Sequence, residues 1–337
     1  MDRTAENSYV RLTPDLRLFV GNNELKDLPL ELWDLENMTV LSLRNNSLKG
    51  ISERIGNLHR LQELNIASNQ IETLPFEILE LLQPRAGSAL LFTTHPNPFL
   101  LPVKPVVLDT QPSLSLRSIP QVQREIARLR FLLSQPSTSS LHTLYTMILR
   151  TANEWLRHKL RDPRAQTGPI FAASTEVTYY DTDGAPLRSQ HELVHAGSGN
   201  GFGAIAGSPS LPSEWCSKAP SLFEIAVRSC TTSSWLREVT AELLYVPPRV
   251  EQGIRMALDS KARSLHVCSV CQRRCIIKRA EWIEYWYCNK DDPSIPTRLA
   301  FLPFTRKACS FGCVKSLSEE REKRDEQDVV DSTMMDV

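Results

Sequence analysis

The sequence predicts an α/β solenoid of curved, parallel strands, followed by a mainly α region and a small α+β module. Three observations lead to this fold class. An apolar pattern recurs at a fixed period near the N-terminus, apolar residues later follow helical spacing, and six of the eight cysteines lie between Cys268 and Cys313. These changes of pattern divide the chain into residues 1–100, 101–183, 184–212, 213–263, 264–320 and 321–337.

The N-terminal pattern is L-x-L-x-x-N-x-L. Copies begin at Leu18, Leu41 and Leu64, 23 residues apart, and a degenerate fourth copy, FTTHPNPF, begins at Phe92. Each unit has an apolar edge that it can bury only by stacking on its neighbours. The pattern resembles the leucine-rich repeat family, in its short intracellular class with Leu-Pro in the second half. We expect the asparagine of each copy to bond the backbone of adjacent coils, which makes a ladder of Asn23, Asn46, Asn69 and Asn97.

Side chains between the buried positions of each strand should point to the concave face of the solenoid, because strand side chains alternate. On this face we expect Phe19, Ser42, Arg44, Asn65 and Thr93. They are mixed and mostly small, and no charge dominates, so they do not identify a ligand. The resemblance implies a protein partner, since concave repeat surfaces usually bind proteins. The alternative is a short solenoid that only supports the rest of the chain.

Residues 101–183 combine helical and extended patterns, and residues 213–263 are again helical. Apolar spacing predicts helices from Val122 to Leu133 and over about 139–160, 220–230, 233–245 and 248–262. Residues 169–181 have an extended pattern. Between these regions, residues 184–212 are rich in Gly, Ser and Pro and predict a flexible loop. The charged end, 321–337, predicts an acidic, disordered tail.

One helical stretch, PSLFEIAVRSC, has Leu222, Ala226 and Cys230 on a single stripe. It is similar to the elongin-binding box of ubiquitin-ligase substrate receptors, although that box normally ends in an aliphatic residue or Ala and this one ends in Cys230. The following VPPRVEQGI, Val246 to Ile254, resembles a cullin box. The resemblance implies elongin and cullin partners, with Leu222 and Ala226 at the interface. The alternative for both segments is an amphipathic core helix.

The cysteine-rich segment 264–320 contains Cys268-x-x-Cys271, which is a knuckle spacing. Cys309 and Cys313 follow at i, i+4, just before a charged helical stretch. This order resembles a treble-clef zinc module. Four thiolates make a closed, tetrahedral site, which is structural rather than catalytic. Alternatives for one of these four ligands are Cys288, Cys275 and His266.

The stretch HELVH, His191 to His195, fits the H-E-x-x-H pattern of zinc proteases. That chemistry needs a helix, because only i, i+4 spacing places both histidines on one face of the metal. Glycine and proline flank the motif closely, and Ser198 stands where the extended motif requires Gly. We therefore expect an accidental match and a chain that is not an enzyme, with a zinc metalloprotease as the alternative function.

Composition narrows the remaining classes of function. Lys plus Arg and Asp plus Glu number 39 each, so the net charge is zero and gives no support for a nucleic-acid partner. No apolar run approaches the roughly 20 residues of a membrane span, and the N-terminus lacks the apolar core of a signal peptide. The sequence thus predicts a cytoplasmic or nuclear scaffold or adaptor that binds a protein through its repeats. A substrate receptor of a cullin-type ubiquitin ligase is the more specific alternative.

Overall fold

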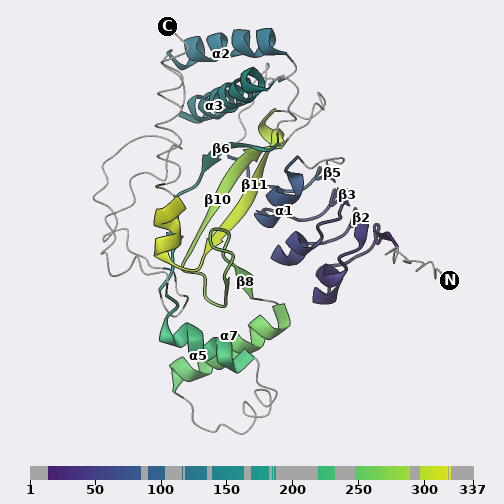
Figure 1. The fold of residues 1–337 in the computed structure, drawn as a ribbon, viewed down its shortest axis with the longest axis vertical. Coiled ribbons are helices and arrows are strands. Elements are labelled where there is room, and N and C mark those ends of the chain that lie inside the picture. Colours follow the sequence, from purple (N-terminus) through teal and green to yellow (C-terminus); the bar gives the residue numbers. More distant parts are fainter. Residues whose placement is uncertain are drawn as a thin grey trace, which may run out of the picture.

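The computed structural model describes residues 14–84, 90–102, 116, 118–134, 139–162, 168–181, 184, 186, 219–231, 247–263, 265–288, 297–317 and 319. The HELVH motif, the helix expected over 233–245 and the acidic tail lie outside these residues. The molecule is elongated, with a long β-hairpin at its centre, the N-terminal repeats on one side and a helical pair at each end (Figure 1). Among the described helices, none combines the length and hydropathy needed to cross a bilayer.

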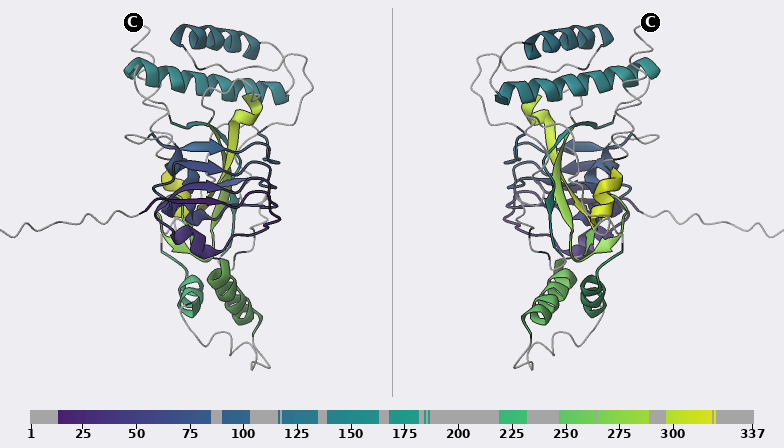
Figure 2. Two further views of the ribbon diagram at one scale, coloured as in Figure 1. Left: turned by 90° about the vertical axis from the view of Figure 1, so that its right-hand side faces the viewer. Right: turned by 90° about the vertical axis from the view of Figure 1, so that its left-hand side faces the viewer.

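The repeats form a parallel four-stranded sheet, which we call the repeat sheet. In order across the sheet, its strands are β1 (Leu16–Phe19), β2 (Met38–Ser42), β3 (Glu63–Asn65) and β5 (Leu91–Thr93). The register aligns Leu18, Leu41, Leu64 and Phe92, the first residues of the four sequence copies. The predicted period therefore places equivalent residues side by side, and Figure 2 shows the coils stacked one above another.

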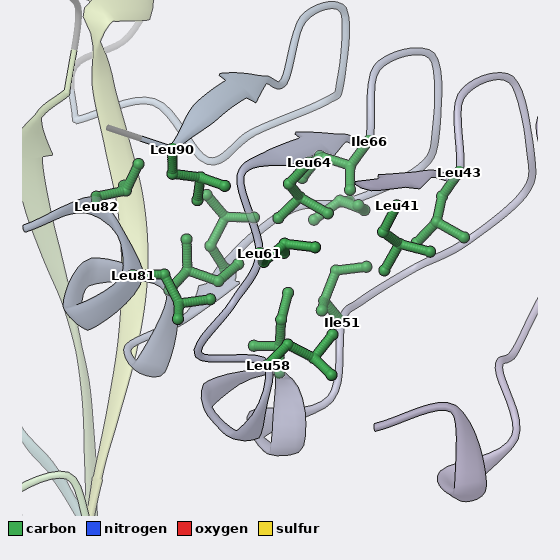
Figure 3. Packing of buried hydrophobic residues seen from close by; sticks show 14 of the residues in the cluster. Leu41, Leu43, Ile51, Leu58, Leu61, Leu64, Ile66, Leu81, Leu82 and Leu90 are labelled. Carbon is green, nitrogen blue, oxygen red and sulfur yellow. The ribbon is translucent and has the colours of Figure 1, made fainter. Parts of the chain in front are cut away.

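Return segments connect the strands and close each coil. They are η1 (Leu30–Asp34), η2 (Glu53–Asn57), the short β4 (Leu74–Pro75) and α1 (Glu77–Leu82). Ser52 caps η2, because its hydroxyl accepts from the Arg54 N–H at 3.3 Å. The leucines and isoleucines of strands and return segments point into one apolar interior, where Leu43, Leu58 and Leu64 are completely buried (Figure 3). Burying such a side chain contributes about 1.5–3 kcal/mol, so the stacked coils stabilise one another.

A second sheet, the hairpin sheet, begins within the repeats. Its strands are β4, β11 (Phe301–Ala308), β10 (Ala280–Tyr287) and β6 (Ile170–Ser174), with β7 (Thr178–Tyr179) also paired to β10. Phe304 of β11 pairs in parallel with Leu74 of β4, and both side chains join the repeat interior. This sheet crosses the expected segments 1–100, 101–183 and 264–320. Sequence patterns did not predict that connection, because strand pairing over such separations leaves no local signature.

Helices cover the two ends of the hairpin sheet. The helices α2 (Ile119–Leu133) and α3 (Ser139–Arg161) pack on each other, with Val122, Leu129 and Ile148 in their common core, and α3 packs on β6. At the opposite end, α5 (Leu222–Thr231) packs against α7 (Pro248–Arg263). The helices predicted by apolar spacing are confirmed at these four places. Between them lie the short strands β8 (His266–Val267) and β9 (Arg274–Cys275) and, before β11, η4 (Thr297–Ala300).

Candidate metal centre and partner surfaces

Four thiols converge between the β8–β9 turn and the segment that follows β11. The Sγ atoms of Cys268, Cys271, Cys309 and Cys313 all lie within 4.8 Å of one another. Cys271 Sγ is 3.5 Å from Cys309 Sγ, which is 3.8 Å from Cys313 Sγ. Sulfur ligands about 2.3 Å from a tetrahedral ion are separated by roughly 3.8 Å. The four thiols therefore have the spacing and the chemistry of a tetrahedral zinc site.

Two turns position these thiols. Cys268 and Cys271 lie in the β8–β9 turn, where the Gln272 N–H donates to the Cys268 carbonyl at 2.8 Å. Gln272 has a φ of 59°, a left-handed conformation that costs a residue with a side chain about 1–2 kcal/mol. Contacts outside the turn must offset this cost. On the other side, the Cys313 N–H donates to Ser310 Oγ at 3.2 Å and so helps to start the helix over residues 311–317.

The thiols also shift one another's protonation. Hydrogen bonds from the thiols of Cys309 and Cys313 hold the pKa of Cys268 far below its ordinary value. The same contacts raise the pKa of Cys309, which keeps its proton. A thiolate supported by neighbouring thiols already forms part of a metal-binding set, because the thiolate is the form that ligates a metal. A divalent cation would replace the remaining protons.

The three alternative ligands lie elsewhere. Cys275 is buried in β9, and Cys288 packs against the repeat interior. Burial raises the pKa of both thiols, which favours the uncharged form over a ligand. His266 Nδ1 lies 3.4 Å from a carboxylate oxygen of Glu53. Among the described residues, the one set of at least three metal-ligating side chains that converge is the four-cysteine set.

A buried charged pair connects the hairpin sheet to the β8–β9 turn, which carries Cys268 and Cys271 and which we call the thiol turn. Glu284 is 0% exposed and accepts from Arg306 at 3.2 Å and from the indole N–H groups of Trp282 and Trp286 at 2.8 and 3.0 Å. Arg306 also donates to the carbonyl of Ser269, inside the thiol turn, at 2.7 Å. The guanidinium thus joins the sheet to the turn and offsets the buried charge of the carboxylate.

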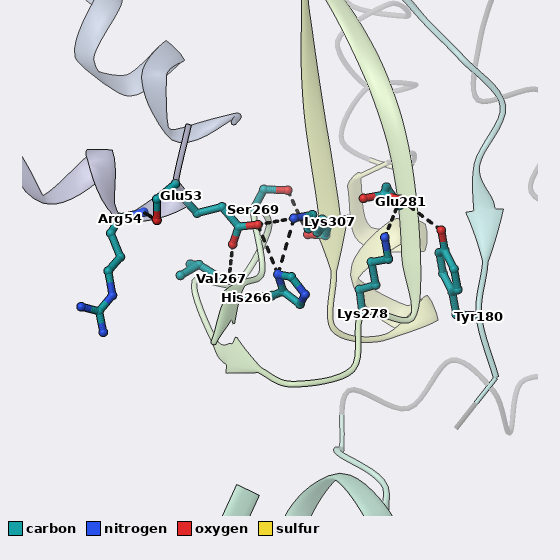
Figure 4. Close-up of polar contacts among 10 residues, drawn as sticks. Glu53, Arg54, Tyr180, His266, Val267, Ser269, Lys278, Glu281 and Lys307 are labelled. Atoms are coloured by element: carbon teal, nitrogen blue, oxygen red, sulfur yellow. Dashed lines mark hydrogen bonds and ion pairs between the residues drawn. The ribbon is translucent and has the colours of Figure 1, made fainter. Parts of the chain in front are cut away.

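Glu53 fastens the second repeat to the same region. Its carboxylate accepts from the Val267 N–H at 2.8 Å and pairs with His266 and Lys307 (Figure 4). Burial opposes the charge of Glu53, but the hydrogen bonds and charges of His266 and Lys307 lower its pKa to about 2. Glu53 is therefore ionised at neutral pH and links η2 to both β8 and β11.

The residues expected to bind a partner form an aligned row on the repeat sheet. Phe19, Ser42, Asn65 and Thr93 are cross-strand neighbours, and we call the surface that they form the open face. Phe19 is 67% exposed. A second row on the same side of the sheet, two residues earlier along each strand, also belongs to the open face and ends in Leu91, which is 61% exposed. Arg44, just beyond the end of β2, is exposed as well.

The asparagine ladder runs beneath the turns at one end of the strands. Asn46 Nδ2 donates at 3.0 Å to the carbonyl of Val20 in the preceding coil. Asn69 and Asn97 make the equivalent bond one coil further along, at 3.0 and 2.9 Å. Asn23, in the first coil, donates to carbonyls of its own turn. These amides satisfy backbone groups that the coil geometry leaves without strand partners.

The α5 helix exposes the stripe that resembles an elongin-binding box. Leu222 is 85% exposed and Ala226 is exposed beside it, whereas Cys230 is partly buried. The buried face of α5 consists instead of Phe223 and Val227, which pack against α7. The segment therefore forms an amphipathic helix packed on another helix, as the core-helix alternative expected, but Phe223 and Val227 make the contact and Leu222 and Ala226 do not.

Glu224 is a buried carboxylate that sequence reasoning missed. It reaches from α5 to accept from the backbone N–H groups of Ile276 and Ile277 at 2.8 and 2.9 Å. Its own N–H donates to Ser221 Oγ at 3.0 Å, which caps the helix. The S-x-x-E spacing is typical of a capping box. In a capping box, however, the carboxylate would accept from the backbone N–H of Ser221, whereas here it accepts from another segment.

Comparison with known proteins agrees with the repeat geometry. Residues 36–77 match the family described as Leucine Rich repeats (2 copies). The chain carries leucine-rich repeats. One relative, leucine-rich repeat and calponin homology domain-containing protein 1 of Mus musculus, is 34% identical over 64 residues. That match covers 19% of this chain and 9% of the mouse protein. The family match lies within the leucine-rich repeats and includes neither the four thiols nor α5.

Proposed function

We propose that this leucine-rich repeat chain is a non-enzymatic scaffold that binds a protein through the open face. The observation that carries the proposal is the pair of exposed apolar side chains, Phe19 and Leu91, at the two edges of an aligned sheet surface. Large apolar and aromatic side chains supply most of the binding energy in protein interfaces. The row that begins at Phe19 continues with the small polar residues Ser42, Asn65 and Thr93, and the row that ends in Leu91 contains the charged residues Arg17 and Glu63.

Affinity capture with the full chain tests this role. We expect the double variant Phe19→Ser, Leu91→Ser to lose the partners that bind the repeats while its thermal stability changes little, because both side chains are already exposed. The matched control is Leu35→Ser, an exposed leucine that follows η1 and lies off the strands. Partners retained by the double variant, or lost equally with Leu35→Ser, would contradict the proposal.

A second candidate function is that of a substrate receptor of a cullin-type ubiquitin ligase. The exposure of Leu222 favours it, because a leucine that enters a partner's pocket must first be free of its own core. Val250 on α7, within the cullin-box resemblance, is exposed too, although Ile254 packs partly into the core with Val227. In this role the open face would select the substrate and α5 would recruit the ligase. Direct binding of a purified elongin heterodimer to the chain tests it.

The four thiols support a structural zinc ion. Cys268, Cys271, Cys309 and Cys313 would hold it, and the ion would cross-link the β8–β9 turn to the start of the last helix. Four protein ligands leave no open position for a substrate, so a role in catalysis is not part of the proposal. A cytoplasmic or nuclear location fits this use of cysteine, because reducing compartments preserve thiols.

A further inference from the structure

A cavity of about 360 Å³ lies between the return segments of the repeats and the β8–β9 hairpin. It is on the opposite side of the repeats from the open face, because η2 and α1 line it instead of the strands. The end of α5 and both strands of the β8–β9 hairpin complete its wall. Its charged lining residues are Glu53, Arg54, His59, Glu77, Glu80 and Arg274.

Glu77 is the exceptional member of this lining. It is the first residue of α1 and is only 8% exposed. Among the described residues, none besides Glu77 itself, through its own backbone N–H, donates a hydrogen bond to its carboxylate. The side chain fits there because residue 56 is glycine: a Cβ at Gly56 would approach Glu77 Cβ at 3.2 Å. Burial of this carboxylate penalises its charge, and the charges of Glu53 and Glu80 add to the penalty, while its own backbone N–H and the charge of Lys307 offset part of it.

Three of the charged residues that line the cavity, Glu53, Glu80 and Arg54, have other partners. Glu53 pairs with Lys307 and His266. Glu80 lies 3.5 Å from Gln272 Nε2. The Arg54 guanidinium pairs with Asp34 at 3.5 Å, and its side chain points away from Glu53 (Figure 4).

The spacing of these carboxylates excludes a compact metal site. Among the described residues, the cysteine set is the one group whose ligand atoms come within 4.8 Å of one another, so the oxygens of Glu53, Glu77 and Glu80 do not converge on one ion. The volume of about 360 Å³ has room for an organic cation, with a charged head at Glu77 and a body that fills the remaining space.

We propose that the cavity binds an organic cation, an ammonium or guanidinium group, whose charge pairs with Glu77. This goes beyond the scaffold role and does not depend on it. The group can come from a free small molecule or from a lysine or arginine side chain of a protein partner, since both present the same chemistry. The polar rim, which includes Gln272 and Asn57, offers hydrogen-bond partners to the part of the ligand beyond the charged group.

The proposal predicts a specific dependence of affinity on pH. Burial raises the pKa of Glu77 to about 7, and the charges of Glu53 and Glu80 act in the same direction. A cation that stays charged throughout binds the ionised carboxylate, so affinity should rise as pH increases through about 7. Between pH 6 and pH 8 the ionised fraction, and with it the affinity, should increase about tenfold. The other charged groups that face Glu77 or line the cavity are Arg54, His59, Arg274 and Lys307.

Titration of the full chain, with its metal retained, against n-butylammonium and methylguanidinium tests the proposal. Calorimetry or chemical-shift changes should show saturable binding to the wild type with the stated pH dependence. Glu77→Gln keeps the size of the side chain and removes its charge, and it should abolish binding. Glu31→Gln, an exposed glutamate of η1 outside the cavity, is the matched control and should bind as the wild type does.

A second arm separates the two sources of the cation. Short peptides with a central lysine or arginine are compared with the same peptides carrying norleucine. Tighter binding of the basic peptides than of the free cations assigns the cavity to a partner's side chain, and the reverse order assigns it to a small molecule. The absence of saturable binding by either probe, or unchanged binding by a correctly folded Glu77→Gln variant, would overturn the proposal.

Discussion

The repeat sheet and the hairpin sheet share one apolar interior, which Leu74 and Phe304 of the hairpin sheet join, but they bury their side chains in different ways. In the repeat sheet, equivalent leucines such as Leu41 and Leu64 recur at one spacing and pack against copies of themselves. The hairpin sheet instead brings together β4, β6 and β11, from three distant parts of the chain. It also buries the ion pair of Glu284 and Arg306. The periodic core of the repeats tolerates approximate copies of its pattern. The hairpin sheet instead depends on individual pairings, such as Glu284 with Arg306, that no other described residues repeat.

The thiol site should show the largest effect of any single change. Cys268→Ser or Cys313→Ser should reduce bound zinc from one ion per chain to none and unfold the region around the β8–β9 turn. The reason is that a structural site of this kind supplies much of the folding free energy of its surroundings. Metal analysis of the purified chain, together with proteolysis of residues 265–317, measures both outcomes.

Two controls accompany the thiol variants. Cys288→Ser removes a partly buried thiol outside the four-sulfur set and should keep the ion. His191→Ala, in the HELVH stretch, should also leave the zinc content unchanged. Zinc that survived Cys268→Ser but was lost from His191→Ala would reverse the assignment and revive the protease alternative.

Substitution in the buried ion pair of Glu284 and Arg306 should lower stability nearly as much. Glu284→Gln keeps the shape of the side chain but leaves the Arg306 guanidinium, itself buried, without a counter-charge. Removing one partner of a buried pair costs about 3–5 kcal/mol. Urea unfolding measures the loss. Glu281→Gln on the same strand removes a partly exposed pair with Lys278 and should cost roughly 0–1 kcal/mol. Equal losses for the two variants would show that the Glu284 pair has no special role.

A single substitution in the repeat core should lower the free energy of unfolding by less. Leu43 is completely buried among the coils, so Leu43→Ala should lower the free energy of unfolding by about 2–5 kcal/mol. The adjacent residue, Arg44, is exposed, and Arg44→Glu should change stability by no more than about 0.5 kcal/mol while weakening binding at the open face. If the two variants were equally destabilising, the register of the repeats would need revision.

The same comparison explains how much the sequence could predict. The period of 23 residues predicted the parallel register of Leu18, Leu41 and Leu64, because each position repeats the same role. The spacing of Cys268, Cys271, Cys309 and Cys313 raised the possibility of a metal site because ligation demands particular separations along the chain.

Other features could not be predicted in this way. The buried carboxylate of Glu224 accepts from backbone groups about 50 positions away, and Arg306, the counter-charge of the buried Glu284, lies 22 positions away; the local sequence indicates neither of these contacts. The pairing of β11 with β4 is hidden for the same reason. Each of these features depends on which distant segments meet, and single-sequence periodicity carries no information about that choice.

The stability of the repeats should depend on pH through two carboxylates, Glu77 and Glu53, which titrate in separate pH ranges. Glu77 has a folded-state pKa of about 7 against 4.5, so its protonated form is favoured in the folded chain. The resulting contribution to the free energy of unfolding is about 3 kcal/mol. It is complete below pH 4.5 and is lost as pH rises to about 7. Glu53, with a pKa of about 2, contributes above pH 4.5 and loses its contribution as pH falls towards 2.

Unfolding by urea at pH 5 and pH 8, in a buffer free of amines, tests the Glu77 window. Relative to the wild type, Glu77→Gln should lose less stability between the two pH values. Glu31→Gln should follow the wild type. A wild-type pH dependence that is unchanged by Glu77→Gln would remove Glu77 as its source.

The smallest effect on stability is expected where the apolar side chain lies outside both cores. Leu222 is 85% exposed, so Leu222→Ser should change the melting temperature hardly at all, within about 0.5 kcal/mol of stability. If α5 docks on elongin, the same change should abolish capture of the purified elongin heterodimer, because an anchor leucine carries much of such an interface. Phe131→Ser, at another exposed apolar position on α2, is the matched control and should retain capture. A stable Leu222→Ser variant that captures elongin as well as the wild type, or a wild type that captures none, would reject the receptor role and leave the scaffold that binds through its repeats.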